Sequence, residues 1–241
     1  MNIYESFSMA MKNIKSSKTR SILTMLGIII GVAAVIVITG IGNGMEKYMK
    51  DQFESMGTNT LSVYVFGRGN QKMTVDDMQV IVDENSEYLD KMTPTISFQG
   101  SKKVGTDNLN STNVTGVSEQ FLDIKGLKLT DGRNIQYMDI KNRNSVCIIG
   151  SYVNKKYFGG KGLGDSVKLN GRDFTIVGVL EEKAKSEEYS TDDAIYVPYS
   201  TVSRMMNIKD VSDFTITFKS EEMSSQAKKA LEDSLTEYFN G

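Results

Sequence analysis

One stretch of the sequence, from Ile22 to Ile41, contains twenty consecutive residues without a charged side chain. An α-helix rises about 1.5 Å per residue, so this stretch spans about 30 Å as a helix, which is the thickness of the hydrocarbon core of a bilayer. No other part of the sequence has an apolar run of comparable length. The sequence therefore predicts one transmembrane helix over residues 22–41, with a short tail before it and a large folded part after it.

The charges on either side of this helix predict its orientation. Four Lys and Arg residues lie between positions 12 and 20, opposed by Glu5 alone, whereas the charges after the helix nearly balance. By the positive-inside rule, the N-terminus is cytoplasmic and residues 42–241 are extracytoplasmic, in the inner or plasma membrane. A cleaved signal peptide is the alternative, but it would have an apolar region of only about 7–15 residues and a small-residue cleavage site. The longer stretch, followed by no convincing site, favours an anchor.

Amphipathic segments flank the membrane helix. Apolar residues recur at helical spacing within residues 1–21, among lysines and serines. They predict a segment on the cytoplasmic membrane surface or, alternatively, a docking element for a cytoplasmic partner. A second helical stripe, from Met45 to Met56, predicts that the membrane helix continues as a stalk over residues 42–57 and ends at Gly57. The glycines at positions 40, 42 and 44 could hinge this long helix.

Small residues within the membrane helix predict a packing face. Gly27 and Gly31 are four positions apart, and Ala34 continues roughly the same face. Small side chains at this spacing let a second helix approach closely. The alternative is that glycine is simply frequent in membrane helices.

Residue composition excludes several classes of function. The chain of 241 residues has no histidine, which excludes Ser-His-Asp and Cys-His catalysis and histidine-ligated metal sites. It has no P-loop sequence, so it is not itself an ATPase of that class. The net charge is −2, and the part after the first 21 residues is mildly acidic, which argues against nucleic acid as a partner. Cys147 is the only cysteine, so no intrachain disulfide can form, and its apolar neighbours indicate a buried side chain.

No group of residues predicts an enzyme, a metal site or a cofactor bound by this chain. Paired carboxylates can act in acid–base catalysis, and Glu187-Glu188 and Asp192-Asp193 are the candidate pairs. They lie in residues 183–193, a charge-rich run without apolar periodicity that we expect to be an exposed, mobile, solvated loop. The 14 methionines suggest copper export as an alternative, but most lie on helical stripes or in the membrane helix, where packing explains them.

The part of the chain after the stalk predicts an α+β fold. Residues 58–115 begin as a strand, a helix and further strands, and residues 208–241 close as a strand and a helix. Residues 116–207 have the short strands and glycine turns of a β-rich insertion. We therefore expect an α/β lobe built from both ends of the domain and interrupted by a β-rich lobe. The first strand, residues 58–66, has apolar residues on both faces, which predicts a central position in its sheet.

Local signals mark individual elements of this domain. Thr74 followed by Asp77 is a capping-box pattern that predicts the start of a helix. Asn170-Gly171, between two runs of apolar pattern, is the strongest hairpin signal in the chain. Residues 213–220 alternate cleanly between apolar and polar side chains, as in a strand with one buried face.

Several blocks of sequence resemble one known family in the order that the family has them. KTRSILTMLGIIIGVAAVIVITGIGNG, residues 18–44, resembles the first membrane helix of MacB-type ABC transporter permeases, within the FtsX-like permease superfamily. The later blocks resemble the MacB-like periplasmic core domain, and together the matches cover nearly the whole chain. These later blocks are Gly132-Arg133 with Asp139, then VCIIGSYVNKKYFGG (146–160), FTIVGVL (174–180) and YVPYST (196–201).

The resemblance implies a function and a set of partners. It implies a permease that dimerises, pairs with a cytoplasmic ATPase that binds the ATP, and works with a membrane-anchored adaptor outside. The outer domain, with a porter-like α/β lobe and a sabre-like β-rich lobe, would convert ATP hydrolysis into mechanical work on a peptide, drug or lipid-like substrate. The alternative is an FtsX-like signalling permease that activates an extracellular cell-wall hydrolase and transports nothing. Gly132, Arg133, Gly150 and Gly159 match positions whose implied roles are turns and packing.

The sequence departs from the family pattern in two ways. Permeases of this family have three further membrane helices after the outer domain, whereas this sequence stops at Gly241, so we expect either a truncated form or an incomplete permease. Some relatives carry a fused N-terminal ATPase domain, which this sequence lacks, so the ATPase is expected to be a separate chain.

Overall fold

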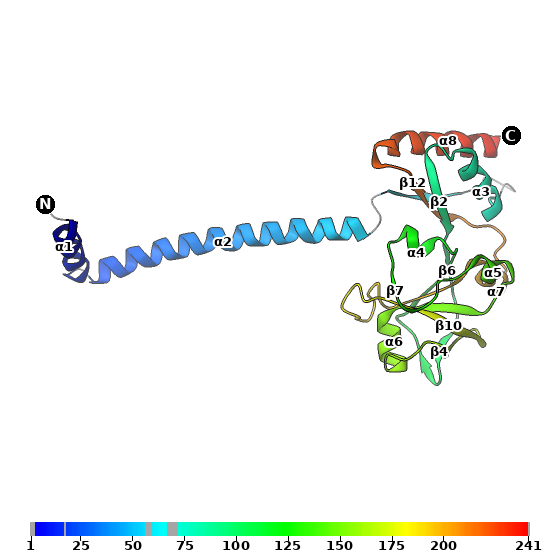
Figure 1. Ribbon diagram of the computed structural model, residues 1–241, viewed down its shortest axis with the longest axis horizontal. Coiled ribbons are helices and arrows are strands. Elements are labelled where there is room, and N and C mark those ends of the chain that lie inside the picture. The colour runs from blue at the N-terminus through cyan, green and yellow to red at the C-terminus, as the bar shows by residue number, and fades with distance from the viewer. Residues whose placement is uncertain (1–2, 17, 56–58, 67–71, 241) are drawn as a thin grey trace. The chain divides into compact units, whose positions relative to one another are not determined.

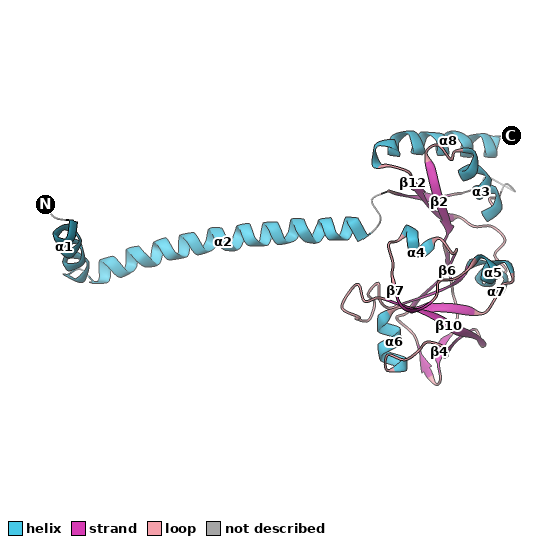
Figure 2. Ribbon diagram, in the orientation of Figure 1, coloured by secondary structure: helices cyan, strands magenta, loops and turns pink. Residues whose placement is uncertain are grey.

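A computed structural model describes residues 3–16, 18–55, 59–66 and 72–240 of the chain. The chain divides into two compact units, residues 1–54 and residues 55–241, and each is described by itself. Figure 1 labels their helices and strands, and Figure 2 shows the same view coloured by secondary structure.

The first unit consists of two helices, α1 (Ile3–Ser16) and α2 (Lys18–Ser55) (Figure 1). α2 has 38 residues, which corresponds to a length of about 57 Å. Its part from Lys18 to Glu46 is long and apolar enough to cross a membrane. The helix runs without interruption through the glycines at positions 40, 42 and 44, so the hinge considered there is not present. Gly57, the expected end of the stalk, lies outside the described residues.

The second unit contains a three-stranded antiparallel sheet made from both ends of the outer domain. Its strand order is β1-β12-β2, with β1 at Thr60–Tyr64, β12 at Asp213–Phe218 and β2 at Leu89–Pro94. Two helices, α3 (Val75–Glu84) and α8 (Ser224–Asn240), supply buried apolar side chains to the same core as this sheet. The predicted capping box at the start of α3 is confirmed, because the Thr74 hydroxyl accepts from the Asp77 N–H and the Asp77 carboxylate accepts from the Thr74 N–H.

A nine-stranded mixed sheet forms the rest of the second unit (Figure 2). Its order is β3-β6-β11-β8-β10-β9-β4-β5, with β7 paired to β10. The β6–β11 and β8–β10 pairs are parallel, and the remaining pairs are antiparallel. The strands are β3 (Ile96–Ser97), β4 (Lys102–Val104), β5 (Asp107–Asn108), β6 (Asn113–Val117), β7 (Leu129–Gly132), β8 (Val146–Ile149), β9 (Ser166–Leu169), β10 (Arg172–Leu180) and β11 (Ala194–Pro198).

Short helices cover the nine-stranded sheet, and two apolar clusters fill the second unit. The larger cluster joins the three-stranded sheet, α3 and α8 to one part of the nine-stranded sheet. The smaller cluster includes Phe121, Ile140, Ile148 and Leu180. Cys147 is fully buried, as the sequence predicts. The helices are α4 (Phe121–Ile124), α5 (Tyr137–Lys141), α6 (Ser151–Phe158) and α7 (Tyr199–Met205), and a 3-10 turn, η1 (Glu221–Met223), precedes α8.

The chain crosses between the two sheets twice. The first crossing is at Thr95, the single residue between β2 and β3, and the second follows α7 and leads into β12. The strands of residues 96–117 therefore pair in the nine-stranded sheet, whereas the sequence analysis assigned residues up to 115 to the other lobe. The side-chain pattern of a short strand predicts which of its residues are buried, but it does not predict which sheet the strand joins.

The fold class is confirmed: the protein has one N-terminal apolar helix and a mixed α/β outer domain. The prediction for the first strand is wrong, because β1 is an edge strand paired to β12 alone. Along it, Val63 and Val65 are buried, whereas Tyr64 and Phe66 are 63% and 84% exposed. The aromatic residues that made the strand look buried on both faces lie on an open face.

Candidate functional site

The small residues Gly27, Gly31 and Ala34 lie on α2, in the part that can cross a membrane. A Cβ atom built on either glycine would meet no atom within 4 Å. No part of this chain that the structure describes thus covers the surface around these glycines. Packing of another helix on this surface stays a prediction.

The predicted turn residue Gly132 sits where β7 ends against β10. Its φ is +81°, and a Cβ atom there would lie 2.2 Å from the Val177 carbonyl oxygen. The next N–H, that of Arg133, donates to the same carbonyl at 2.8 Å. Only glycine combines this left-handed conformation with so close an approach of two backbones.

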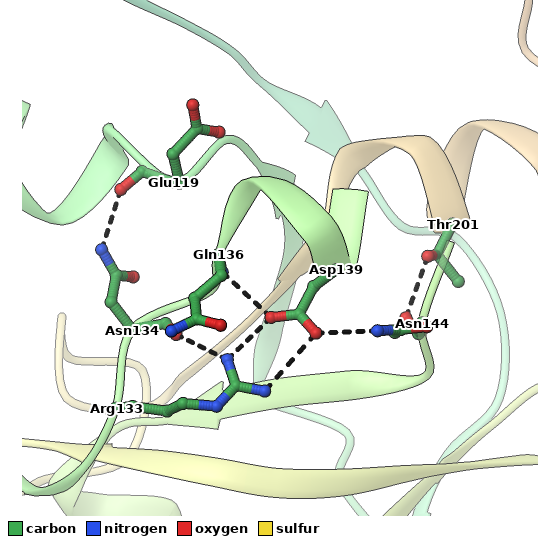
Figure 3. Close-up of polar contacts among 7 residues, drawn as sticks. All are labelled: Glu119, Arg133, Asn134, Gln136, Asp139, Asn144 and Thr201. Carbon is green, nitrogen blue, oxygen red and sulfur yellow. Dashed lines mark hydrogen bonds and ion pairs between the residues drawn. The ribbon is translucent and has the colours of Figure 1, made fainter. Parts of the chain in front are cut away.

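Arg133 and Asp139 form the centre of a polar network (Figure 3). The guanidinium of Arg133 donates to the two carboxylate oxygens of Asp139 at 2.7 and 3.4 Å. The same carboxylate accepts from the Gln136 N–H and from the Asn144 side-chain amide, both at 2.9 Å. Asp139 is 3% exposed, whereas the Arg133 side chain is 41% exposed, so the ion pair joins a buried carboxylate to a guanidinium that reaches solvent.

The balance of burial and hydrogen bonding decides the charge of Asp139. Burial disfavours the carboxylate, but the hydrogen bonds from Arg133, Asn144 and Gln136 together outweigh it and hold the pKa of Asp139 below its ordinary value of 3.8. The network therefore contains an ionised carboxylate at neutral pH.

Neighbouring hydrogen bonds connect this network to two other parts of the chain (Figure 3). The Thr201 hydroxyl on α7 donates to the Asn144 carbonyl at 3.1 Å. The Asn134 amide donates to the Glu119 carbonyl, between β6 and α4, at 2.8 Å. The Arg133 network thus ties β7, α5, α7 and the segment before α4 together, which is a structural role and not a chemical one.

The other predicted turn residues lie at separate places. Gly150 precedes α6, and a Cβ atom there would lie 2.1 Å from the Asp192 carbonyl oxygen. Gly159 ends α6 with a φ of +57°. Asn170 and Gly171, with φ of +47° and +81°, form the hairpin between β9 and β10. Asn170 also exchanges two hydrogen bonds of 2.9 Å with the backbone of Ser101.

The expectation that residues 183–193 form a solvated loop is wrong at its two aspartates. Asp192 and Asp193 are 3% and 0% exposed. The Asp192 carboxylate accepts from the backbone N–H groups of Lys183, Ala184 and Ser186 at 2.7–2.9 Å. The side chains turn inward to hold the loop's own backbone, which a charge pattern does not reveal. These carboxylates are occupied as structural acceptors, and Glu187 and Glu188 are exposed.

Contacts between the two sheets form a junction that the sequence analysis did not identify. The Ser118 N–H donates to the Thr93 hydroxyl at 3.1 Å, and the Met92 N–H donates to the Gln120 side chain at 3.1 Å. Thr93 and Ser118 are both buried. Each bond joins β2 of the small sheet to the segment that follows β6 of the large sheet. Serine, threonine and glutamine are too common for these residues to have signalled a junction.

The described residues hold no group of three acidic or cysteine side chains placed to bind a metal ion. The carboxylates of Asp139, Asp192 and Asp193 accept hydrogen bonds from side chains or from the backbone, whereas the Asn134 side-chain oxygen is buried without a hydrogen-bond partner among the described residues. The polar contacts described here connect segments within the second unit.

Comparison with known proteins gives the same picture. The model of the MacB-like periplasmic core domain matches residues 21–234. The macrolide export ATP-binding/permease proteins MacB of Aggregatibacter actinomycetemcomitans and of Neisseria meningitidis serogroup A are 30% and 32% identical over 97% and 96% of this chain. The chain spans 37% of the length of each of these relatives.

Solved structures share the fold of the outer domain. The periplasmic region of MacB from Actinobacillus actinomycetemcomitans matches with a TM-score of 0.63 and 26% identity, over 78% of this chain and 87% of that one. The extracellular domain of YknZ, a noncanonic ABC-type transporter of Gram-positive bacteria, matches in fold, with a TM-score of 0.61 and 18% identity, over 74% of this chain and 94% of that one. The chain belongs to the family of ABC transporter permeases that carry a MacB-like periplasmic core domain.

Proposed function

We propose that this chain supplies the first membrane helix and the outer domain of a permease subunit in an ABC-type exporter. A separate ATPase subunit in the cytoplasm binds ATP, and its dimerisation moves α2 and, through α2, the outer domain. The outer domain then does mechanical work on a peptide, drug or lipid-like substrate. In this proposal the chain itself binds no cofactor and hydrolyses nothing.

The observation that carries the proposal is the continuity of α2. The helix has 38 residues, so it exceeds the hydrocarbon core of a bilayer by about 27 Å. Proline is the commonest cause of a sharp kink in a helix, and α2 contains no proline. An unbroken helix that leaves the membrane and leads into the chain of the outer domain is a suitable element for transmitting a displacement.

The proposal includes an orientation and three partners. The excess of Lys and Arg before the apolar stretch supports a cytoplasmic N-terminus and an extracytoplasmic outer domain. The surface around Gly27 and Gly31 is open to a second membrane helix, in keeping with a permease dimer. The MacB relatives are named as ATP-binding/permease proteins for macrolide export, which supports an ATPase partner, whereas the adaptor outside the membrane rests on the family resemblance alone.

Transmission along α2 can be tested by interrupting the helix between its membrane part and its outer part. In the native-length protein, purified with its ATPase, Gly44→Pro removes a backbone hydrogen bond and costs about 3 kcal/mol of helix stability, whereas Gly44→Ala keeps the helix. We expect trapping of ATP on the partner to change hydrogen exchange in the outer domain of the wild type and of Gly44→Ala. In Gly44→Pro the change should be lost while the ATPase still co-purifies. An unchanged exchange pattern in the wild type would contradict the proposal.

A second candidate, an FtsX-like signalling permease, uses the same helix and domain but activates an extracellular cell-wall hydrolase. The YknZ match favours neither alternative, because it shows the fold alone. The partner of the outer domain distinguishes them. Affinity purification of the tagged, native-length protein from its own cells should recover an ATPase with an adaptor for an exporter, and an ATPase with a hydrolase for a signalling permease. Recovery of neither partner set under conditions that preserve other transporter complexes would contradict both.

A further inference from the structure

A cleft of about 610 Å³ opens between the two sheets of the outer domain. Residues of β1 and β12 line one side, and residues of β3, β6 and β11 line the other. Most of the lining side chains carry hydroxyl, amide or charged groups. None of the contacts described for the Arg133 network or for the loop aspartates uses this cleft, so its polar lining has no role in the functions assigned above.

The backbone of β3 presents an open edge to this cleft. β3 is the last strand of the nine-stranded sheet and pairs with β6 alone, with Ser97 opposite Thr115. The Phe98 N–H donates to the Val114 carbonyl at 2.9 Å, so Phe98 bonds to β6. In an antiparallel pair, alternate residues bond to opposite sides. The N–H and C=O of Ser97, and by the same alternation those of Gln99, therefore point away from β6. Both residues are exposed and line the cleft.

Aromatic side chains flank the opposite wall. Tyr64 of β1 lines the cleft and is 63% exposed, and Phe66, which shares its face of the strand, is 84% exposed. Exposed aromatic side chains at the mouth of a cleft can supply contact area to a bound chain.

Two lysines give the cleft a charge preference. Lys102 and Lys125 are both half-buried and line the cleft. No carboxylate of the described residues pairs with either lysine, and the Lys102 ammonium donates instead to the Thr112 carbonyl at 2.5 Å. Asp213 is the one carboxylate among the cleft-lining residues, and its burial raises its pKa, with Lys125 opposing the rise. The cleft therefore suits a ligand with a negative group.

We propose that this cleft binds an extended acidic segment of polypeptide, which adds as a strand to the open edge of β3. The Ser97 and Gln99 backbone groups would pair with the backbone of the segment. Lys102 and Lys125 would take an acidic side chain, and Tyr64 and Phe66 would pack against an apolar one. Strand addition of this kind draws affinity from main-chain hydrogen bonds and selectivity from side-chain contacts. The proposal concerns binding, and it can fail or hold independently of transport.

Proline substitution at Ser97 provides a direct test. Because the Ser97 N–H points away from β6, Ser97→Pro removes the donor offered to a ligand and leaves the β3–β6 pairing intact, as is usual for proline on an edge strand. Ser97→Ala keeps the donor and serves as the matched control. The probe is a fluorescein-labelled, end-blocked peptide Thr-Val-Asp-Val-Thr-Val, titrated against the full chain in detergent micelles by fluorescence polarisation. We expect saturable binding to the wild type and to Ser97→Ala, weakened about tenfold in Ser97→Pro.

The charge preference is tested by a double substitution cycle. The peptide with Asn in place of Asp has the same shape without the charge, and Lys125→Gln removes one cation. The wild type should bind the Asp peptide about fivefold more tightly than the Asn peptide, and Lys125→Gln should remove most of that difference. Equal affinity of the wild type for both peptides would overturn the acidic preference.

Backbone methylation of the peptide keeps the test decisive even if Ser97→Pro does not fold. Methylation of one set of alternate peptide amides should abolish binding, and methylation of the other set should leave it, because only one edge of the added strand faces β3. Equal binding of the two methylated peptides would overturn strand addition, as would unchanged affinity in a folded Ser97→Pro. The absence of saturable binding to the wild type up to about 1 mM peptide would also overturn it.

Discussion

Gly132 and Gly171 share a φ of +81° but differ in the space around them. At Gly171 a Cβ atom would meet nothing within 4 Å, whereas at Gly132 it would lie 2.2 Å from a backbone oxygen. We expect Gly171→Ala to lower the free energy of unfolding by about 1–2 kcal/mol, the cost of a left-handed alanine. Gly132→Ala should lower the free energy of unfolding further, because the backbones of β7 and β10 must also move apart. Urea unfolding of the outer domain in both variants measures the difference, and equal losses would contradict the structure at β7.

Asp139 makes the stability of the outer domain depend on pH. Because its pKa in the folded protein lies below the ordinary 3.8, the carboxylate stabilises the fold above that value, and this stability is lost as the pH falls through the lowered pKa. We expect Asp139→Asn to lower the free energy of unfolding by about 2 kcal/mol at pH 7. The difference from the wild type should shrink as the pH falls below 3.8, the ordinary value of the carboxyl group.

The control for Asp139 is Asp131→Asn, which changes an exposed carboxylate on β7. It should leave the free energy of unfolding within about 0.5 kcal/mol of the wild type at both pH values. Urea titrations at pH 7 and pH 3 give the comparison. A loss in Asp139→Asn that stays constant with pH would mean that packing, and not charge, explains the role of Asp139.

At the scale of single residues, the sequence predicted the backbone conformation at turns and helix starts better than it predicted contacts between residues that lie apart in the chain. The Asn170-Gly171 pair and the Thr74–Asp77 pair act over a few positions, so their local chemistry is complete in the sequence. The partners of Asp139 and Asp192 include groups five to nine positions away, and the close approach at Gly150 needs the Asp192 carbonyl from a distant segment. Such contacts depend on how the chain folds back, and no local pattern encodes that.

The side chain of Asp192 holds one part of the loop of residues 183–193. Asp192 accepts three backbone N–H groups, from Lys183, Ala184 and Ser186. We expect Asp192→Ala to release these amides, so that their hydrogens exchange with solvent at least tenfold faster. The released loop should also be cleaved faster by trypsin at its lysines. Glu188→Ala, which removes an exposed carboxylate of the same loop, should change neither. Unaltered exchange in Asp192→Ala would show that other contacts hold the loop.

At the scale of elements, helices were more predictable than the positions of strands. α2 and α3 are marked by length, periodicity and caps, all of which are local. β1 has the composition of a buried strand, yet it lies at an edge, because strand order depends on partners more than a hundred residues away. The residue pattern of a strand does not determine which strands pair with it. For the same reason, the sequence did not reveal that β3 has an open edge.

The orientation of the whole molecule can be measured through introduced cysteines. Cys147 does not contribute background labelling by a maleimide, because its side chain is fully buried and burial raises the pKa of its thiol well above the ordinary range. With the native-length protein in cells whose outer layers admit the reagent, we expect a membrane-impermeant maleimide to label Lys128→Cys in intact cells. Lys12→Cys should be labelled only after the membrane is permeabilised. The reverse pattern would place the N-terminus outside and contradict the proposed direction of transmission.

The division of the whole molecule into an apolar helix and an outer domain followed from hydropathy alone. The arrangement of the outer domain as two sheets did not, since it depends on the crossing at Thr95 and on the junction between Thr93 and Ser118. The order of strand and helix patterns predicted a β-rich insertion within a domain made from both ends of the chain, but it did not locate the residue at which the chain crosses from one sheet to the other.

Thr95 alone separates the two sheets along the chain at the first crossing, and this shortness has a mechanical consequence. A linker of one residue has no slack, so the sheets cannot slide apart there and can only turn about the backbone near Pro94, whose own φ is fixed by its ring. The sheets are also joined by the connection after α7 and by a shared apolar cluster, so a turn about residue 95 would have to shift these contacts as well. In the proposed function, a displacement of β1 would turn one sheet against the other about this residue, and the cleft between the sheets would widen or narrow.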